Sequence, residues 1–223
     1  MLKCAKHAYC IATEGIALKK QSSERIDEIV RIATEVIGER GFFGTTIQEI
    51  ADRMDLSQAG VLKHVKNKQN LLDLVLRQFD LNGSNNSNGY LSYKLSLSRE
   101  ELAEQPALMP EWYREIARIN SENPYQTRAY LVLRAEALDE SHPAHDYFAH
   151  RGQRLRKQVE QVPWKLPPEY SEPEQVGLLS MTIGSAMEGL QLRWLGEPGI
   201  DFLQTWAAYE DILFPLPHWE GYR

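Results

Sequence analysis

Apolar residues recur along the chain at the spacing of amphipathic helices. One side of the segment from Ser23 to Gly41 is apolar at i, i+3, i+4 and i+7, which predicts a first helix there. Three shorter segments with the same period follow, each opened by a residue that caps helix N-termini: Thr46 with Glu49 in a capping-box pattern, then Ser57, then Asn67. Four helices are therefore predicted within about sixty residues.

Between Asn82 and Gly89 every residue is Asn, Gly or Ser, which predicts a flexible loop. Helical periodicity returns after it. Six more helices are predicted, each bracketed by Pro, Gly, Ser or Asn: 98–104 (with Ser98 and Glu101 as a capping box), 110–119, 124–140, 143–162, 172–194 and 200–214. No strand-like alternation is long enough to predict a sheet, so the chain is expected to be all-α.

The spacing of the second and third helices predicts a helix-turn-helix. The helix from Thr46 to about Arg53 is followed by a tight turn and by a helix that opens at Ser57, and the second helix of this motif can enter a major groove of DNA. Apolar inner residues would fix the angle between the two helices. Gln58, Ala59 and Lys63 would then point outward as base-reading residues, because Gln can pair with adenine, Lys can donate to guanine and Ala can meet a thymine methyl group.

Phosphate contacts are expected at the starts of the short helices. Free N–H groups there, together with Thr46, Ser57, Lys66 and Lys68, suit phosphate oxygens. The net charge of −6 does not oppose this, because it is unevenly distributed. Residues 1–80 hold 12 Lys and Arg against 11 Asp and Glu, whereas the remainder holds 13 against 20. The acidity therefore belongs to the C-terminal part of the chain.

The stretch from Arg25 to Leu76 resembles the DNA-binding domain of the TetR family of transcriptional repressors. The resemblance rests on Gly41-Phe42, the run from Thr45 to Ala51, Leu56-Ser57, His64, and Lys68 before Leu71-Leu72. Three positions depart from the family pattern: Asp55 replaces the usual Gly of the turn, Leu62 a phosphate-touching Tyr, and Val65 a Phe. Asp tolerates the left-handed conformation that the turn requires. The run from Ser57 to His64 resembles a subset of the family with Leu in place of that Tyr, and the phosphate contact is expected to pass to His64 or Lys63.

The resemblance implies a ligand-responsive, sequence-specific transcriptional regulator, a repressor released from its operator by a small molecule. The expected organisation is an N-terminal extension at 1–22 that is mobile, a three-helix helix-turn-helix domain at 23–70, a larger helical effector-binding and dimerisation domain at 71–215, and a tail at 216–223. One short recognition helix reads few base pairs, so a homodimer on a palindromic operator is expected. In the family, the last two helices pair with their symmetry mates as a four-helix bundle. The interface residues predicted on this basis are Gly177, Ser180, Gly184, Met187, Phe202, Trp206 and Tyr209. The alternative is that both helices fill the core of their own chain.

By the same resemblance the central helices would enclose an effector pocket. Apolar residues with a few hydroxyl or indole groups are typical of such pockets. The candidates are Trp112, Tyr113, Ile116, Tyr125, Tyr130, Leu133 and Phe148. The simpler interpretation of each is a core side chain.

Other chemistries find little support in the sequence. His142, His145 and His150 lack the spacing of a metal site, as do Cys4, His7 and Cys10, so neither a metal nor a cofactor is expected. No nucleotide-binding glycine loop, nucleophile elbow or HExxH motif is present, which argues against an enzyme. No apolar run reaches the length of a membrane span, and a cytoplasmic protein is expected. The competing function is a helical ligand-binding or adaptor protein with a weakened DNA-binding head.

Overall fold

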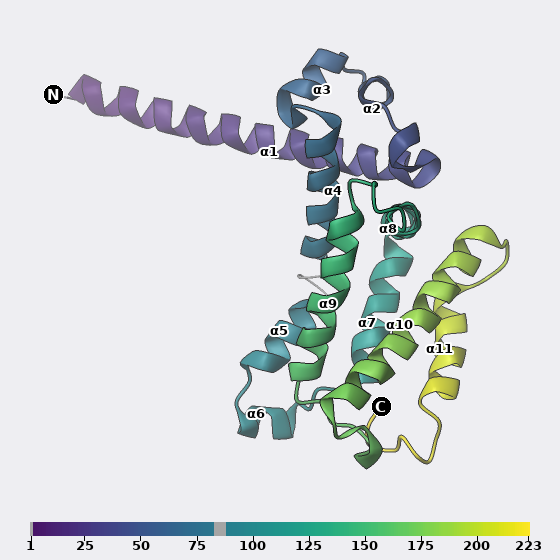
Figure 1. The fold of residues 1–223 in the computed structure, drawn as a ribbon. Helices are drawn as coiled ribbons and strands as arrows, with labels where there is room; N and C mark the ends of the chain where they lie inside the picture. Colours follow the sequence, from purple (N-terminus) through teal and green to yellow (C-terminus); the bar gives the residue numbers. More distant parts are fainter. Residues whose placement is uncertain (1, 83–87) are drawn as a thin grey trace. The chain divides into compact units, whose positions relative to one another are not determined.

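The computed structural model describes residues 2–82 and 88–223, with side chains described for 23–80 and 89–223. The regular secondary structure among these residues is helical, apart from one isolated bridge between Ala107 and Trp164. The predicted all-α class is confirmed. None of the helices in the described ranges combines the length and the apolarity that crossing a membrane would require. In chain order (Figure 1) the elements are α1 (Leu2–Gly44), α2 (Ile47–Arg53), α3 (Gln58–Val65), α4 (Lys68–Asn82), α5 (Asn88–Ser96), α6 (Arg99–Glu104), α7 (Met109–Glu122), α8 (Pro124–Glu136), α9 (His145–Gln161), the short 3₁₀ helix η2 (Pro168–Tyr170), α10 (Pro173–Gly196) and α11 (Phe202–Leu213).

The chain divides into two compact units, Met1–Leu76 and Arg77–Arg223. The N-terminal unit holds α1, α2, α3 and the start of α4, and its core is formed by apolar residues from each of them, among them Ile29, Val36, Ile50, Val61 and Leu72. Gly41 interrupts the end of α1 with φ 72°, a conformation that favours glycine. The expected N-terminal extension is part of α1, which begins at Leu2; its mobility stays a prediction.

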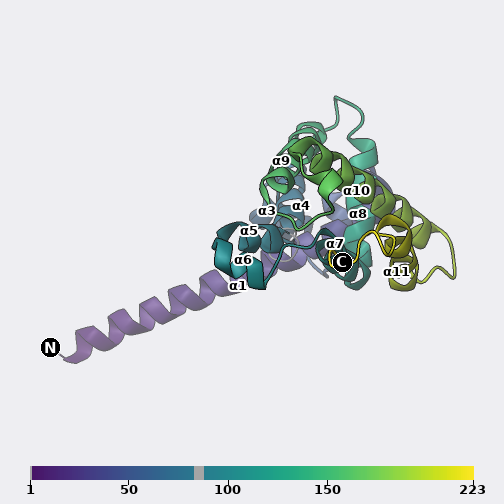
Figure 2. The same cartoon turned by 90° about the horizontal axis from the view of Figure 1, so that it is seen from below.

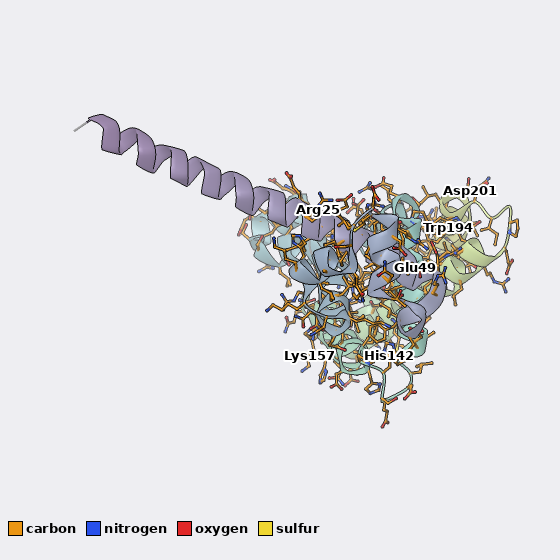
Figure 3. The ribbon with its side chains drawn as sticks, turned by 90° about the horizontal axis from the view of Figure 1, so that it is seen from above. Arg25, Glu49, His142, Lys157, Trp194 and Asp201 are labelled. Atoms are coloured by element: carbon orange, nitrogen blue, oxygen red, sulfur yellow. The ribbon has the colours of Figure 1, made fainter. Side chains whose placement is uncertain are left out.

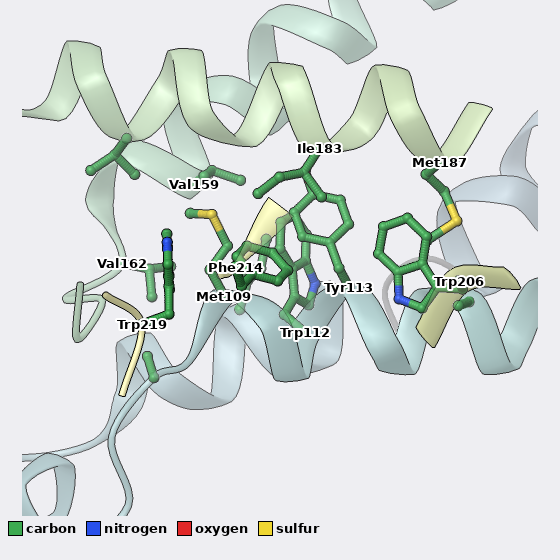
Figure 4. Close-up of a cluster of buried hydrophobic side chains, with 14 of the residues drawn as sticks. Met109, Trp112, Tyr113, Val159, Val162, Ile183, Met187, Trp206, Phe214 and Trp219 are labelled. Atoms are coloured by element: carbon green, nitrogen blue, oxygen red, sulfur yellow. The ribbon is translucent and has the colours of Figure 1, made fainter. Parts of the chain in front are cut away.

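In the C-terminal unit, α10 packs against α8, α9 and α11, and α7 packs against α8 and α11. Figures 1 and 2 both show α10 beside α9 and α11. Figure 4 shows the centre of the core, where Trp112 and Tyr113 point from α7 toward Ile183 on α10 and the Trp206 ring lies below Met187. This cluster around Trp112, Tyr113 and Trp206 holds α7, α10 and α11 together.

Asp201 caps α11 by accepting a hydrogen bond from the Gln204 amide at 2.9 Å, and Figure 3 shows it near Trp194.

Apart from the earlier start of α1 and the short η2, the structure differs from the predicted helices mainly in two places. The predicted loop covers residues 82–89 and no helix is predicted for 90–97, yet α5 begins at Asn88; residues 83–87 of that loop lie outside the described residues. Tertiary contacts explain this helix, because Leu91 is buried and the Lys94 ammonium donates to the carbonyls of Gln105 and Pro106 at 2.9 and 3.1 Å. The sequence there is rich in Ser, Asn and Gly, and so carries little helical signal.

The second difference concerns the connection between α8 and α9. The helix predicted to reach residue 140 ends at Glu136, and the next begins at His145 rather than at Pro143. Asp139 explains the break, because its carboxylate accepts hydrogen bonds from the amide and the hydroxyl of Ser141 at 2.9 and 2.8 Å. Such short-range contacts compete with helical hydrogen bonds.

The last residues of the chain pack onto the C-terminal unit. Trp219 is buried, with its ring 4.8 Å from that of Phe214, and Arg223 donates to the Phe214 carbonyl at 3.0 Å. His218 contacts the carboxylate of Glu169 in η2. The segment expected as a tail therefore contributes to the core.

Candidate nucleic-acid interface and a cavity in the C-terminal unit

Three side chains cap the short helices of the N-terminal unit, as the sequence predicts. Thr46 accepts a hydrogen bond from the Glu49 amide, Ser57 from the Gly60 amide and Asn67 from the Asn70 amide, at 3.1, 3.1 and 2.8 Å. These caps fix where α2, α3 and α4 begin.

The capping box predicted for Thr46 and Glu49 is only half formed. The Glu49 carboxylate does not return to the Thr46 amide; instead it accepts from Arg40 at 2.9 Å and from Arg53 at 3.0 Å. Arg53 also donates to Glu39 at 2.9 Å, and these hydrogen bonds hold its pKa above the usual value. The network joins α1 to α2 and stabilises the angle between them. Because its members are partly exposed, its contribution to stability is modest.

The turn between α2 and α3 is built on Asp55. Its φ is 53°, so Asp55 adopts the left-handed conformation that this residue type tolerates, as expected from the sequence. The Leu56 amide then donates to the Ala51 carbonyl at 2.9 Å, which closes the turn. Together with the buried side chains of Ile50, Ala51 and Val61, this turn sets how α3 lies against α2.

The residues predicted to read bases lie on the outward side of α3. Gln58, Ala59 and Lys63 are exposed, whereas Val61 and Val65 on the opposite side are buried. An amide, a methyl group and an ammonium are thus presented together on a short helix. This set of groups can contact base edges in a major groove.

The predicted phosphate-binding residues have different surroundings. Thr46, Ser57 and Lys66 are exposed and His64 is half-buried. Lys68 is held at the end of α1, where its ammonium donates to the Phe43 carbonyl at 3.3 Å and lies 4.4 Å from the centre of the Phe42 ring. Lys66 therefore presents a more open cation than Lys68, and it sits at φ 64° where α3 ends.

A cavity of about 200 Å³ lies within the C-terminal unit. Four of the seven predicted effector residues line it: Trp112, Tyr113, Ile116 and Tyr130. Tyr125, Leu133 and Phe148 do not. Leu133 is fully buried in the core. The Phe148 ring packs edge-to-face against the Tyr130 ring, with the ring centres 5.4 Å apart. For Leu133 and Phe148 the simpler interpretation as packing side chains fits the structure, whereas Tyr125 is partly exposed at the start of α8.

Most of the polar lining residues were not found from the sequence. They come from α7, α8, α9, α10 and the junction between α7 and α8, and include Asn120, Asn123, Gln126, Thr127, Arg151, Glu188 and Gln191. Arg151 and Glu188 mark a hydrophilic end of the cavity. Burial raises the pKa of the Glu188 carboxyl, although Arg134 at 2.6 Å favours its charged form. No local motif signals these residues, because only the packing of four helices brings them together.

The predicted dimer-interface residues face the core of their own chain. Tyr113 donates from its hydroxyl to the Ser180 carbonyl at 2.6 Å, and a Cβ on Gly184 would lie 3.6 Å from the same hydroxyl oxygen. A Cβ on Gly177 would come within 2.7 Å of a Glu160 carboxylate oxygen. These small residues do allow close helix approach, but toward α7 and α9 of the same chain.

The larger members of the set are enclosed in the same way. Met187, Phe202 and Trp206 are buried, and Tyr209 is half-buried beside Trp206. Their burial favours the alternative interpretation of the sequence, in which both helices fill the core of their own chain. The outward sides of the two helices instead carry other apolar residues: Leu178, Met181 and Leu192 on α10, and Leu203 and Ile212 on α11.

The histidines considered for a metal site contact the backbone instead. His142 accepts from the Ala144 amide at 3.1 Å, and ring nitrogens of His145 and His150 lie 2.9 and 2.6 Å from the carbonyls of Ala137 and Asp146. Among the described residues, no group of three or more His, Cys, Asp or Glu side chains could hold a metal ion. The side chains of Cys4, His7 and Cys10 lie outside the described residues.

Solved structures similar to this chain share its fold. A protein from Rhodococcus sp. described as a TetR-family transcriptional regulator superposes with a TM-score of 0.55 at 20% identity, over 86% of this chain and 98% of that one. A second TetR-family transcriptional regulator, from Mesorhizobium loti, superposes with a TM-score of 0.56 at 15% identity, over 86% of this chain and 96% of that one. The ketosteroid transcriptional regulator KstR2 of Mycobacterium tuberculosis superposes with a TM-score of 0.52 at 21% identity, over 85% of this chain and 92% of that one. At these identities the similarity concerns the fold alone.

Sequence comparisons concern the N-terminal unit. The chain is 32% identical over 59 residues to the HTH-type transcriptional repressor KstR2 of Mycolicibacterium smegmatis, which is 26% of this chain and 29% of the relative. The match thus spans less than a third of that relative. Residues 29–75 match the family model described as bacterial regulatory proteins, tetR family. The chain therefore carries a TetR-family N-terminal helix-turn-helix domain on an all-α fold.

Proposed function

We propose that this protein is a sequence-specific DNA-binding transcriptional regulator, a repressor that binds a palindromic operator as a homodimer and is released from it by a small molecule. The observation that carries the proposal is α3, whose outward side presents Gln58, Ala59 and Lys63 while its other side is buried. The match of residues 29–75 to the tetR family model supports DNA as the partner. The cavity in the C-terminal unit supports a ligand-dependent step.

The experiment that tests DNA binding is a fluorescence anisotropy titration of the full chain against the DNA upstream of its own gene. We expect salt-sensitive binding with a clear preference over scrambled DNA of the same length. Lys63→Ala should relax the preference at one position of each half-site. Lys66→Gln should weaken binding to all sequences alike and lower the salt dependence by about one counterion per half-site.

Lys157→Ala provides the matched control, because Lys157 is an exposed lysine on α9 of the C-terminal unit. This variant should bind like the wild type. A uniform loss of affinity in Lys63→Ala would remove Lys63 from the base-reading set. If no sequence-dependent binding occurred while ligand binding persisted, the protein would be a ligand-binding or adaptor protein instead.

The homodimer is supported by the outward apolar side of α10. Leu178, Met181 and Leu192 are 60, 50 and 61% exposed, and Ser185 and Gly189 lie between them at helical spacing. A second copy that covered this side together with Ile212 on α11 would remove these side chains from water.

Sedimentation velocity tests the dimer. The double variant Met181→Glu/Leu192→Glu should sediment as a monomer, because four carboxylates would be forced into one apolar interface. Leu138→Glu is the control, since Leu138 is 83% exposed on the connection after α8. A wild-type chain that sediments as a monomer at all concentrations would contradict the dimer.

A further inference from the structure

Gln191 is a buried polar side chain that faces the cavity without a partner. It is 6% exposed and lines the cavity from α10. Across the described part of the chain, its carboxamide makes no hydrogen bond. Its polar atoms keep some accessible surface, and the residue lines the cavity. Its hydrogen-bond partner must therefore come from a water or a ligand in the cavity, because an amide left unpaired there is costly. Its donor and acceptor are therefore open to whatever fills the cavity.

Neighbouring polar groups in the lining are already engaged. The Asn123 amide donates to the Ile119 carbonyl at 2.9 Å, and the Thr127 hydroxyl lies 3.2 Å from the carbonyls of Asn120 and Asn123. Asn120 is half-exposed, so water can bind its carboxamide and the free-energy cost of lacking a protein partner is smaller. Gln191 thus differs from the other neutral polar groups of the lining, since it is both buried and available.

Each of the two charged groups at the hydrophilic end is paired with an opposite charge from outside the lining. Arg151 donates to the Asp80 carboxylate at 3.2 Å, and the Tyr147 hydroxyl donates to the same carboxylate at 3.0 Å. Glu188 accepts from Arg134 at 2.6 Å. Because both charges of the lining are already balanced by a partner, a charged ligand would gain little net attraction there to offset its own desolvation. The arrangement disfavours both anions and cations.

The remaining lining is aromatic and aliphatic. Trp112, Ile116, Leu155 and Met187 surround the space with carbon surface. An apolar cavity of about 150 Å³ admits a single benzene ring. This cavity of about 200 Å³ therefore has room for a molecule with one ring or two fused rings. It is smaller than most cavities for drug-sized ligands.

We propose that this cavity binds a neutral, mainly apolar ring compound with one carbonyl or hydroxyl group, which pairs with the Gln191 carboxamide. The inference rests on the proposed function, in which the cavity is the effector site, and it names the chemical class of that effector. A ketone or hydroxyl supplies the hydrogen-bond partner that Gln191 lacks, and leaves both ion pairs intact.

Isothermal titration of the full chain with three matched probes tests the proposal without DNA. The probes are tetralin, its ketone α-tetralone, and a tetralin carboxylate. Wild-type protein should bind α-tetralone at least about tenfold more tightly than tetralin, because a site that holds an unpaired buried amide rejects a ligand lacking the matching group. The carboxylate should bind more weakly than the ketone.

Gln191→Leu should lower the affinity for α-tetralone to that for tetralin. Gln153→Leu makes the same change at an exposed position of α9 and should keep the tenfold preference. Circular dichroism shows whether each variant is folded. Tighter binding of the carboxylate, equal wild-type affinity for ketone and hydrocarbon, an unchanged preference in Gln191→Leu, or no binding of any probe would each overturn the proposal.

The two levels of the proposal fail separately. If α-tetralone binds with the expected dependence on Gln191 but does not change operator affinity, the ligand class stands and the release mechanism fails. If a charged molecule releases the operator while the neutral probes do not bind, the regulator stands and the ligand class fails.

Discussion

The two units position their candidate functional groups over different distances along the chain. In the N-terminal unit, the hydrogen bonds that place α3 join near neighbours, such as Ser57 to Gly60 and Ala51 to Leu56. In the C-terminal unit, the bonds around the cavity join residues far apart: 67 positions for Tyr113 and Ser180, 71 for Arg151 and Asp80. A reading surface can therefore be specified locally, whereas a cavity requires several helices to be packed correctly.

Because the cavity depends on several packed helices, a large truncation in the core of the C-terminal unit should strongly lower its stability. Trp206 is 1% exposed, and its indole N–H donates to Glu210 at 2.9 Å within the aromatic cluster. We expect Trp206→Ala to lower the free energy of unfolding by about 3–5 kcal/mol, measured by urea denaturation with far-UV circular dichroism. It should also weaken α-tetralone binding. Leu138→Ala, at an exposed residue, should change stability by less than about 0.5 kcal/mol. A loss below about 1 kcal/mol in Trp206→Ala would mean that the cluster does not hold the unit together.

The turn of the N-terminal unit should show an intermediate effect. Asp55 has φ 53°, which a β-branched side chain tolerates poorly. Asp55→Val should cost about 1–2 kcal/mol and weaken DNA binding, while Asp55→Gly should be neutral or slightly stabilising. Thermal unfolding and anisotropy titration measure the two effects. Equal stability of the Val and Gly variants would show that this turn does not require the left-handed conformation.

The smallest effect is expected at Gly184, and it separates the two possible roles of α10. A Cβ there would make an ordinary contact with Tyr113, 3.6 Å from its hydroxyl oxygen. Gly184→Ala should therefore leave the dimer intact and change stability by no more than about 1 kcal/mol, with helix propensity favouring the variant. Gly189→Glu, on the outward side, should dissociate the dimer. Loss of the dimer in Gly184→Ala, measured by sedimentation velocity, would restore the interface first predicted from the small residues.

The sequence predicted much more of the N-terminal unit than of the C-terminal unit. Thr46, Ser57 and Asn67 were identified as caps and Asp55 as the left-handed residue of the turn, because each of these roles depends on the residue and its immediate neighbours. α5 was missed because its stability comes from the contacts of Leu91 and Lys94 rather than from helix-forming residues.

On α10 the sequence indicates an apolar stripe and a face of small residues, but it leaves open whether a second copy or the same chain covers the small residues. Helical periodicity shows that Gly177, Ser180 and Gly184 share a face, yet it does not show which neighbour covers that face. The structure places α7 and α9 against it, and leaves Leu178, Met181 and Leu192 outward. The same ambiguity explains why Leu133 and Phe148 were included among the effector residues.

The sequence by itself determined the helical class of this protein, the limits of its short N-terminal helices and the outward set Gln58, Ala59 and Lys63. These features follow from backbone capping, turn conformation and periodicity, which act over a few residues. Only the tertiary structure decided which side of α10 is buried, and that Gln191, Arg151 and Tyr113 meet around one cavity. Burial depends on which distant segments pack together, and a single sequence does not encode those contacts in any local pattern.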